Sequence, residues 1–112
     1  MSGEANRNLG EFEILVLAAV LRGDGEAYGT SIRKEIEERT GRSPSLGALY
    51  ATLSRLESKS YVRSRMGEKT AERGGRAKRH YVIEPLGRRL LEQSLAGLRN
   101  MSEGLIAWRA MS

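Results

Sequence analysis

The sequence contains no cysteine among its 112 residues. This absence excludes disulfides, thiolate metal sites and cysteine nucleophiles together. Small secreted proteins commonly depend on disulfides, so the composition favours a reducing, intracellular setting. The first stretch, MSGEANRNLGEFE, is polar and acidic, unlike a signal peptide, and no apolar run approaches the roughly 18 residues that a membrane span needs. We therefore expect a cytoplasmic protein with no membrane partner.

Histidine is almost absent as well, because His80 is the only one. It stands among basic residues, and the pattern offers no carboxylate partner for it. With one histidine and no cysteine, a single chain assembles neither a zinc site nor a Ser-His-Asp set. Glu35, Glu37 and Glu38 are most simply a solvated helix face. We expect no enzymatic activity, no metal and no cofactor.

Positive charge is concentrated in one part of the chain, whose formal net charge is +5. Residues 59–81 contain eight Lys or Arg and two Glu, which gives that segment +6 and leaves −1 for the remainder. A concentrated basic segment attracts polyanions, of which nucleic acid is the commonest candidate. The alternative is a solvated basic hairpin that binds nothing.

The length allows one domain with a single core, and two helices are predicted first. Residues 9–22, LGEFEILVLAAVLR, are apolar on nearly every side of a helix. Such a helix is buried on more than one side, and a second chain could cover the extra face. A second helix, about 27–39, places Tyr28, Ile32 and Ile36 on one face.

The third predicted helix, residues 45–58, has two different faces. The apolar stripe that would hold it to the core consists of Leu46, Leu49, Leu53 and Leu56. The opposite face is small and uncharged, and consists of Ser45, Gly47, Ala48, Ala51, Thr52 and Ser54. The pattern leaves two N-cap residues open, Ser43 and Ser45.

After Lys59 the pattern changes to alternation. Residues 61–66 and 76–84 predict a two-stranded hairpin with a long, basic, glycine-containing tip. Pro85 then opens a last helix that extends to about residue 110. A heptad-like seam along it resembles a short coiled coil and consists of Leu91, Leu95, Leu98, Met101, Leu105 and Trp108.

This order predicts a mainly α chain with a small β-hairpin (α+β), arranged as a winged helix-turn-helix. In that arrangement the second helix of the pair enters the DNA major groove, which is about 12 Å wide and favours short side chains. Serine, threonine and alanine on helix 45–58 meet this demand. Tyr28 and Tyr50 can rest their rings on the core while their hydroxyls reach phosphates. The alternatives are a small face that packs on another helix, and tyrosines that only edge the core.

Several longer motifs give a specific resemblance. They are Tyr28-Gly29, Ser45-x-Gly47-x-Leu49-Tyr50, Arg55-Leu56-Glu57, and Arg76-x-Lys78-x-x-Tyr81 leading into Gly87. Together they extend over about residues 9–92. In these motifs the chain resembles the PadR family of bacterial winged-helix transcriptional regulators, in its subfamily with small C-terminal domains.

The resemblance implies a repressor that binds a palindromic operator through helix 45–58 in the major groove and through the basic wing, residues 67–79. The expected DNA-binding residues are Tyr28, Ser43, Ser45, Ala48, Tyr50, Thr52, Arg55, Lys59, Arg73, Arg76 and Lys78. It also implies a homodimer in which the first and last helices exchange contacts. The expected interface residues are Leu9, Phe12, Val16, Leu91, Leu95, Leu98, Met101, Leu105 and Trp108.

Some family members bind aromatic molecules against a tryptophan at the dimer interface. Trp108 is therefore a candidate contact for a small-molecule effector that relieves repression, or else a packing anchor for the dimer. Ser60 stands where the family usually has glycine, and a positive φ there would cost about 1 kcal/mol.

We divide the chain into a flexible N-terminus (1–8), a winged-helix DNA-binding domain (9–84) and a C-terminal dimerisation helix (85–112). The alternative function is a winged helix that binds only protein.

Overall fold

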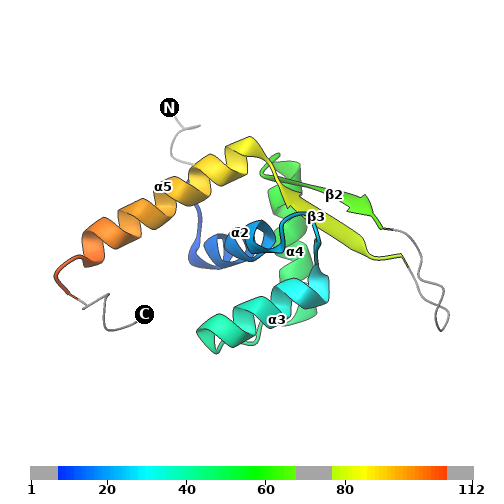
Figure 1. Ribbon diagram of the computed structural model, residues 1–112, viewed down its shortest axis with the longest axis horizontal. Helices are drawn as coiled ribbons and strands as arrows, with labels where there is room; N and C mark the ends of the chain where they lie inside the picture. Colours follow the sequence, from blue (N-terminus) through cyan, green and yellow to red (C-terminus); the bar gives the residue numbers. More distant parts are fainter. Residues whose placement is uncertain (1–7, 68–76, 106–112) are drawn as a thin grey trace.

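The computed structural model describes residues 8–67 and 77–105. Its elements in chain order are α2 (Glu11–Gly23), β1 (Ala27–Tyr28), α3 (Gly29–Thr40), α4 (Leu46–Ser58), β2 (Val62–Met66), β3 (Arg79–Ile83) and α5 (Pro85–Ser102) (Figure 1). The predicted fold class and the order of three helices, a hairpin and a last helix are confirmed, with β1 as an addition. Within the described residues, no helix combines the length and hydropathy of a membrane span.

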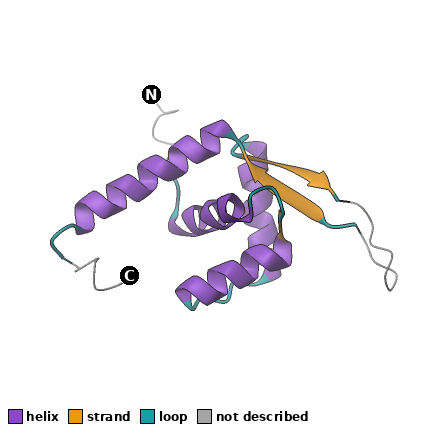
Figure 2. Cartoon of the chain, in the orientation of Figure 1, coloured by secondary structure: helices purple, strands orange, loops and turns teal. Residues whose placement is uncertain are grey.

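The helices and the hairpin take different sides of the molecule. Figure 2 shows β2 and β3 projecting from one side of the group formed by α2, α3 and α4, while α5 extends away on the other side. The hairpin and the end of α5 are thus the two parts of the described chain that stand furthest from the core.

Strand β3 lies in the middle of a three-stranded antiparallel sheet. It pairs with β2, where Ser64 lies opposite Tyr81, and with β1, where Tyr28 lies opposite His80. The sequence pattern missed β1 because two residues are too few to show alternation. The sequence pattern predicts that a helix starts at residues 27 and 28, but this helix begins at Gly29.

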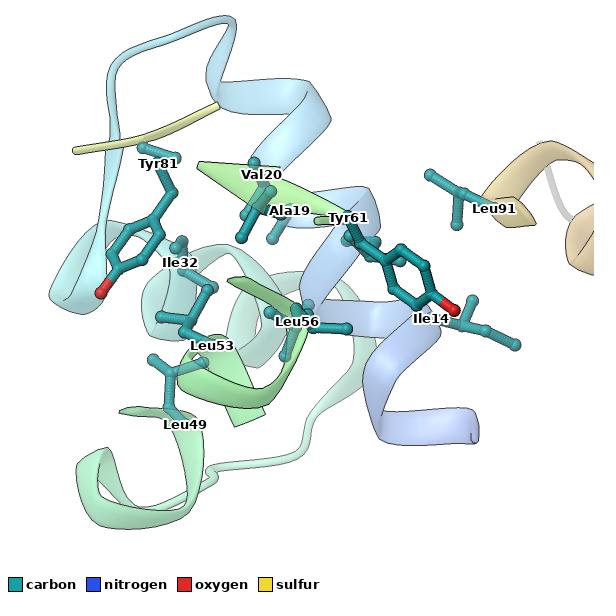
Figure 3. Close-up of a cluster of buried hydrophobic side chains, with 14 of the residues drawn as sticks. Ile14, Ala19, Val20, Ile32, Leu49, Leu53, Leu56, Tyr61, Tyr81 and Leu91 are labelled. Atoms are coloured by element: carbon teal, nitrogen blue, oxygen red, sulfur yellow. The ribbon is translucent and has the colours of Figure 1, made fainter. Parts of the chain in front are cut away.

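The core lies between α2, α3, α4 and one face of the sheet. Figure 3 shows its side chains converging from these elements. Its largest fully buried side chains are Leu17, Ile32, Leu49, Leu53, Leu56, Leu91, Val16, Val20 and Val62. Burying one such side chain stabilises a fold by about 1.5–3 kcal/mol, so this cluster holds α4 firmly against the other helices.

Two residues expected at a dimer interface belong to this core. Val16 is 0% exposed and Leu91 is 1% exposed within the single chain. Neither side chain has surface left for a second chain, so the prediction that they contact one is wrong. The sequence pattern could not separate them from their exposed neighbours, because both lie on apolar stripes of helices.

The turn after α4 contains a residue with strained backbone geometry. Ser60 has φ 65°, in the left-handed region, so the cost that the sequence analysis gave for a positive φ applies here. The turn also carries the start of α5, because the backbone N–H of Glu84 donates to the carbonyl oxygen of Tyr61 at 2.8 Å. A Cβ at Gly87 would lie 2.2 Å from that same oxygen, so only glycine fits there.

Helix α5 begins as predicted and ends earlier. Pro85 is its first residue and Glu84 its N-cap, but the helix ends at Ser102 rather than near residue 110. Gly104 follows with φ 88°, a left-handed conformation that ends helices readily. Trp108 and its predicted roles lie outside the described residues.

Candidate nucleic-acid interface

Helix α4 begins with a side-chain cap that selects between the two predicted starts. The Ser45 hydroxyl oxygen accepts a hydrogen bond from the backbone N–H of Ala48 at 3.1 Å, so Ser45 is the N-cap. Ser43 lies in the preceding turn, where its hydroxyl donates to the Glu37 carboxylate. Ser45 and Ser43 are both exposed, at the positive end of the helix dipole.

The turn before α4 is held by an arginine that sequence reasoning missed. Arg33 of α3 donates from Nε to the carbonyl oxygen of Pro44 at 2.8 Å, in a partly buried contact. This bond ties the N-terminus of α4 to the middle of α3. The sequence gives no sign of this contact, because Arg33 is one of several charged residues on α3.

The outer face of α4 is low and uncharged, as predicted, with two changes of membership. Its exposed small residues are Ser45, Gly47, Ala48, Ala51 and Ser54. Leu46, predicted in the core stripe, is 38% exposed, so it borders this face at the start of the helix and is not part of the buried stripe.

Thr52 was predicted on the exposed face, and that placement is wrong because the side chain is only 2% exposed. It follows Leu49 by three residues and precedes Leu56 by four, which puts it on the buried side of the helix. Its hydroxyl oxygen accepts a hydrogen bond from Arg55 Nη2 at 3.1 Å, so the buried polar group is satisfied. Thr52 therefore positions Arg55 and does not face a ligand.

The two tyrosine-containing motifs meet at the start of α3. A Cβ added to Gly29 would lie 2.0 Å from the hydroxyl oxygen of Tyr50, so the Tyr50 side chain lies directly over the backbone of Gly29. Glycine at 29 is required for this contact. Tyr50 itself is 44% exposed, and its ring spans from α4 to the first turn of α3.

A shallow depression of about 240 Å³ lies between α3, α4 and the start of β3, at the end of the hairpin nearest its tip. Its lining residues are Tyr28, Gly29, Thr30, Tyr50, Ala77, Lys78 and Arg79. Lys78 places its Nζ 4.2 Å from the ring centroid of Tyr28, within cation–π range. The structure thus brings together three of the predicted DNA-binding residues, Tyr28, Tyr50 and Lys78, from three separate parts of the chain.

His80 packs against Tyr28, one of the residues that line this depression. Its ring meets the Tyr28 ring edge-on, with centroids 5.7 Å apart. Its Nδ1 is buried and has no hydrogen-bond partner among the described residues.

Several cations of the region are paired with carboxylates. Lys59 lies 3.8 Å from Glu13, Arg63 lies 3.5 Å from Glu84, and Arg65 lies 3.9 Å from Glu26. The charge of Lys59, a predicted DNA contact, is thus partly offset by the Glu13 carboxylate of α2.

Three other cations lack such a partner. Among the described residues, no carboxylate lies within 4 Å of Arg55, Lys78 or Arg79. Arg73 and Arg76 lie outside the described residues.

Tyr81 of β3 lies close to these cations and stays neutral. Tyr81 is 5% exposed, and burial raises the pKa of its phenol, with the nearby Arg79 acting in the opposite direction. The positive charge around the depression is therefore not offset by a phenolate from Tyr81 at neutral pH.

A helix pair (α3 and α4), an exposed low face on the second helix, and a basic hairpin beside it define a winged helix-turn-helix regulator. The sequence matches the model of the transcriptional regulator PadR-like family over residues 16–93, more than half of the chain. The protein belongs to this family. Its members are transcriptional regulators, which confirms that the chain is not an enzyme. No curated protein sequence matches the chain.

Solved structures of family members have the same fold. The chain is similar to a PadR family transcription regulator from Clostridium difficile R20291, with 28% identity, coverage of 84% of this chain and 93% of that one, and a TM-score of 0.71. A PadR-like transcription factor from Bacteroides fragilis is 20% identical, with 93% of each chain covered and a TM-score of 0.69. Bacillus subtilis PadR in complex with operator DNA is 21% identical, with 76% of this chain and 46% of that one covered and a TM-score of 0.63.

Proposed function

We propose that this protein represses transcription as a homodimer that binds a palindromic DNA operator. The observation that carries the proposal is the juxtaposition of the low face of α4 with the basic depression beside it. A helix in the major groove needs short side chains toward the bases and cations or hydroxyls toward the flanking phosphates. The two surfaces supply these requirements side by side.

On this proposal, α4 enters the major groove with its N-terminus first. Ser45 and Ala48 then face base edges, where a hydroxyl can exchange hydrogen bonds and a methyl can contact thymine. Tyr50 and Lys78 contact the backbone phosphates that border the groove. Ser43 at the helix N-terminus and Arg55 one turn from its C-terminus extend these contacts along the strand.

The dimer is supported by the way α5 leaves the body. Along one stripe, exposure rises from 1% at Leu91 through 46% at Leu95 and 56% at Leu98 to 80% at Met101. The stripe is continuous with the core and becomes uncovered where the described residues 8–67 and 77–105 do not pack on it. A second copy, presenting the same stripe, is the occupant that fits.

A groove of about 340 Å³ beside α5 extends this surface. It lies where Leu9 of the N-terminal segment faces Leu98 and Met101. Half-buried Phe12 does not line this groove and instead lies beside Pro44 and Ala48, so its place at the dimer interface stays a prediction. Leu105 follows the end of α5 and is 79% exposed, so it is free to contact a second copy as predicted. Two-fold pairing through this surface would set two recognition helices about 34 Å apart, one turn of DNA.

A small aromatic effector that relieves repression completes the proposal. Its support is the apolar surface that two paired α5 helices would enclose. Trp108 stays a predicted contact for it. Residues 9–84 as the DNA-binding unit and 85–112 as the dimerisation unit remain our proposed division, and most of the predicted N-terminal segment, residues 1–8, lies outside the described residues.

Selection of bound sequences from a random DNA pool tests the function directly. We expect enrichment of a palindrome, and affinity for it should fall steeply between about 50 and 200 mM salt as phosphate contacts are screened. An unenriched pool together with weak, salt-independent binding would contradict the proposal. That outcome would favour a winged helix that binds protein only.

A further inference from the structure

Three side chains from three elements form a continuous hydrogen-bonded bridge, which we name the Glu57–Ser64–Arg79 bridge. Ser64 Oγ on β2 donates to Glu57 Oε2 in the last turns of α4 at 2.8 Å. Arg79 Nη1 on β3 donates to the same Ser64 Oγ at 3.0 Å. A hydroxyl has one hydrogen to donate and two lone pairs that accept. Ser64 therefore donates its hydrogen to the carboxylate and accepts a hydrogen bond from the guanidinium.

The strand register places this bridge on the face of the sheet that is turned to α4. Ser64 lies opposite the buried Tyr81, and Arg79 precedes Tyr81 by two residues, so all three share one face. Arg63 and Arg65 alternate with Ser64 and lie on the other face, each beside a carboxylate. Arg79 thus differs from the other two strand arginines both in direction and in partner.

Arg79 also lines the depression, together with Tyr50 and Lys78. A guanidinium carries five N–H donors in a planar fork that matches phosphate oxygens. The bridge to Ser64 uses one of them, and no carboxylate of the described residues lies within 4 Å of the others. The side chain is exposed and so can meet an oxyanion from solvent.

We propose that Arg79 binds a phosphate of the DNA backbone and that Ser64 and Glu57 are positioning residues that hold its guanidinium beside α4. The inference rests on the proposed function. The Glu57 carboxylate orients the Ser64 hydroxyl, and the hydroxyl fixes one edge of the Arg79 fork. A long side chain that is already fixed loses less conformational entropy when it binds. The bridge also fixes the angle of the wing against α4.

The test uses the full chain and a duplex of about 30 base pairs recovered from the random pool, long enough for two half-sites. Arg79→Ala should weaken binding about tenfold and lower the slope of log affinity against log salt by about 1, the signature of one lost phosphate contact. Arg63→Ala is the matched control, because it removes the same charge from the opposite face of the same hairpin. It should change affinity less than about threefold and leave the slope unchanged.

Ser64→Ala should weaken binding about threefold without changing the salt slope, since Arg79 remains but is no longer held. In the Arg79→Ala background, Ser64→Ala should have no further effect, because the two residues act through one contact. Ser64→Thr keeps the hydroxyl and should restore the affinity. Thermal unfolding of each variant checks that the fold is intact.

Equal salt slopes for Arg79→Ala and Arg63→Ala would overturn the phosphate contact. An undiminished effect of Ser64→Ala in the Arg79→Ala background would overturn the positioning role. If the unmodified chain failed to bind any DNA, the proposed function itself would fail, and this inference would fall with it.

Discussion

Helices α4 and α5 both present uncharged side chains to solvent, but the side chains differ in size. The outer face of α4 carries serine, glycine and alanine, with Leu46 at its edge 38% exposed. The outer stripe of α5 carries Leu95, Leu98 and Met101, which is 80% exposed. The two exposed surfaces are thus both uncharged, but one consists of small side chains and the other of large apolar ones.

The difference follows from what covers each surface. A polynucleotide groove has to close around a helix, and it excludes bulky side chains while its phosphates supply the attraction. A protein partner removes apolar area from water and gains more from leucine and methionine than from alanine. We infer that α4 meets DNA and α5 meets a second copy. The following predictions test this division of labour, from the largest effect to the smallest.

Leu98→Asp should separate the subunits. A carboxylate at the centre of the α5 stripe would be buried without a partner in the dimer, which is strongly unfavourable. Loss of the second half-site should then weaken operator binding on the order of 10²–10⁴-fold. Asn100→Asp adds the same carboxylate to the same helix away from the stripe, and it should leave both the dimer and the affinity unchanged. Sedimentation equilibrium and a DNA titration measure the two properties.

Ala48→Glu should abolish tight DNA binding and keep the dimer. The added carboxylate would approach phosphates and fill the space that a short side chain leaves, and we expect a loss of about 100-fold. Ala96→Glu is the same substitution at an exposed position of α5. It should spare DNA binding, and equal losses from the two variants would contradict the assignment of α4 to the groove.

Arg33→Ala should weaken binding through the placement of α4 rather than through lost charge. It removes the hydrogen bond to the carbonyl oxygen of Pro44, which contributes about 1 kcal/mol to folding. We expect affinity to fall about threefold together with a lower melting temperature. The neighbouring Lys34→Ala removes an equal charge that meets only Glu38 at the surface, so it should change neither property.

Ser60→Gly should leave both surfaces unchanged and raise the free energy of unfolding by up to about 1 kcal/mol, because glycine adopts a φ of 65° without strain. Ser58→Gly, two residues earlier at the helical end of α4, should not raise it. Urea unfolding measures both. A lower stability of the Ser60→Gly variant would show that the turn is not strained.

Patterns local to one helix were predictable from the sequence, and those that depend on pairing were not. Period and caps predicted four helices and a hairpin, and the family motif marked Ser60 as a position where glycine is usual. Thr52 was misplaced because residue type suggested an exposed face. Its burial depends on position between Leu49 and Leu56, and on Arg55 to satisfy its hydroxyl.

Contacts between elements far apart in sequence lay beyond the pattern. Strand β1 exists only because residues 27 and 28 pair with β3. The Glu57–Ser64–Arg79 bridge depends on the hairpin register, and a shift by one residue would turn Ser64 to the other face. For this reason the DNA-binding residues predicted from the sequence include Lys78 but not its neighbour Arg79.

The mass of the protein–DNA complex tests the central claim most directly. Sedimentation equilibrium of the chain with a selected duplex of about 30 base pairs would count the copies bound. We predict two chains per duplex for the unmodified protein and for Ala96→Glu, and a free dimer with no complex for Ala48→Glu. A single chain bound per duplex, or a complex of undiminished affinity formed by Ala48→Glu, would contradict the account.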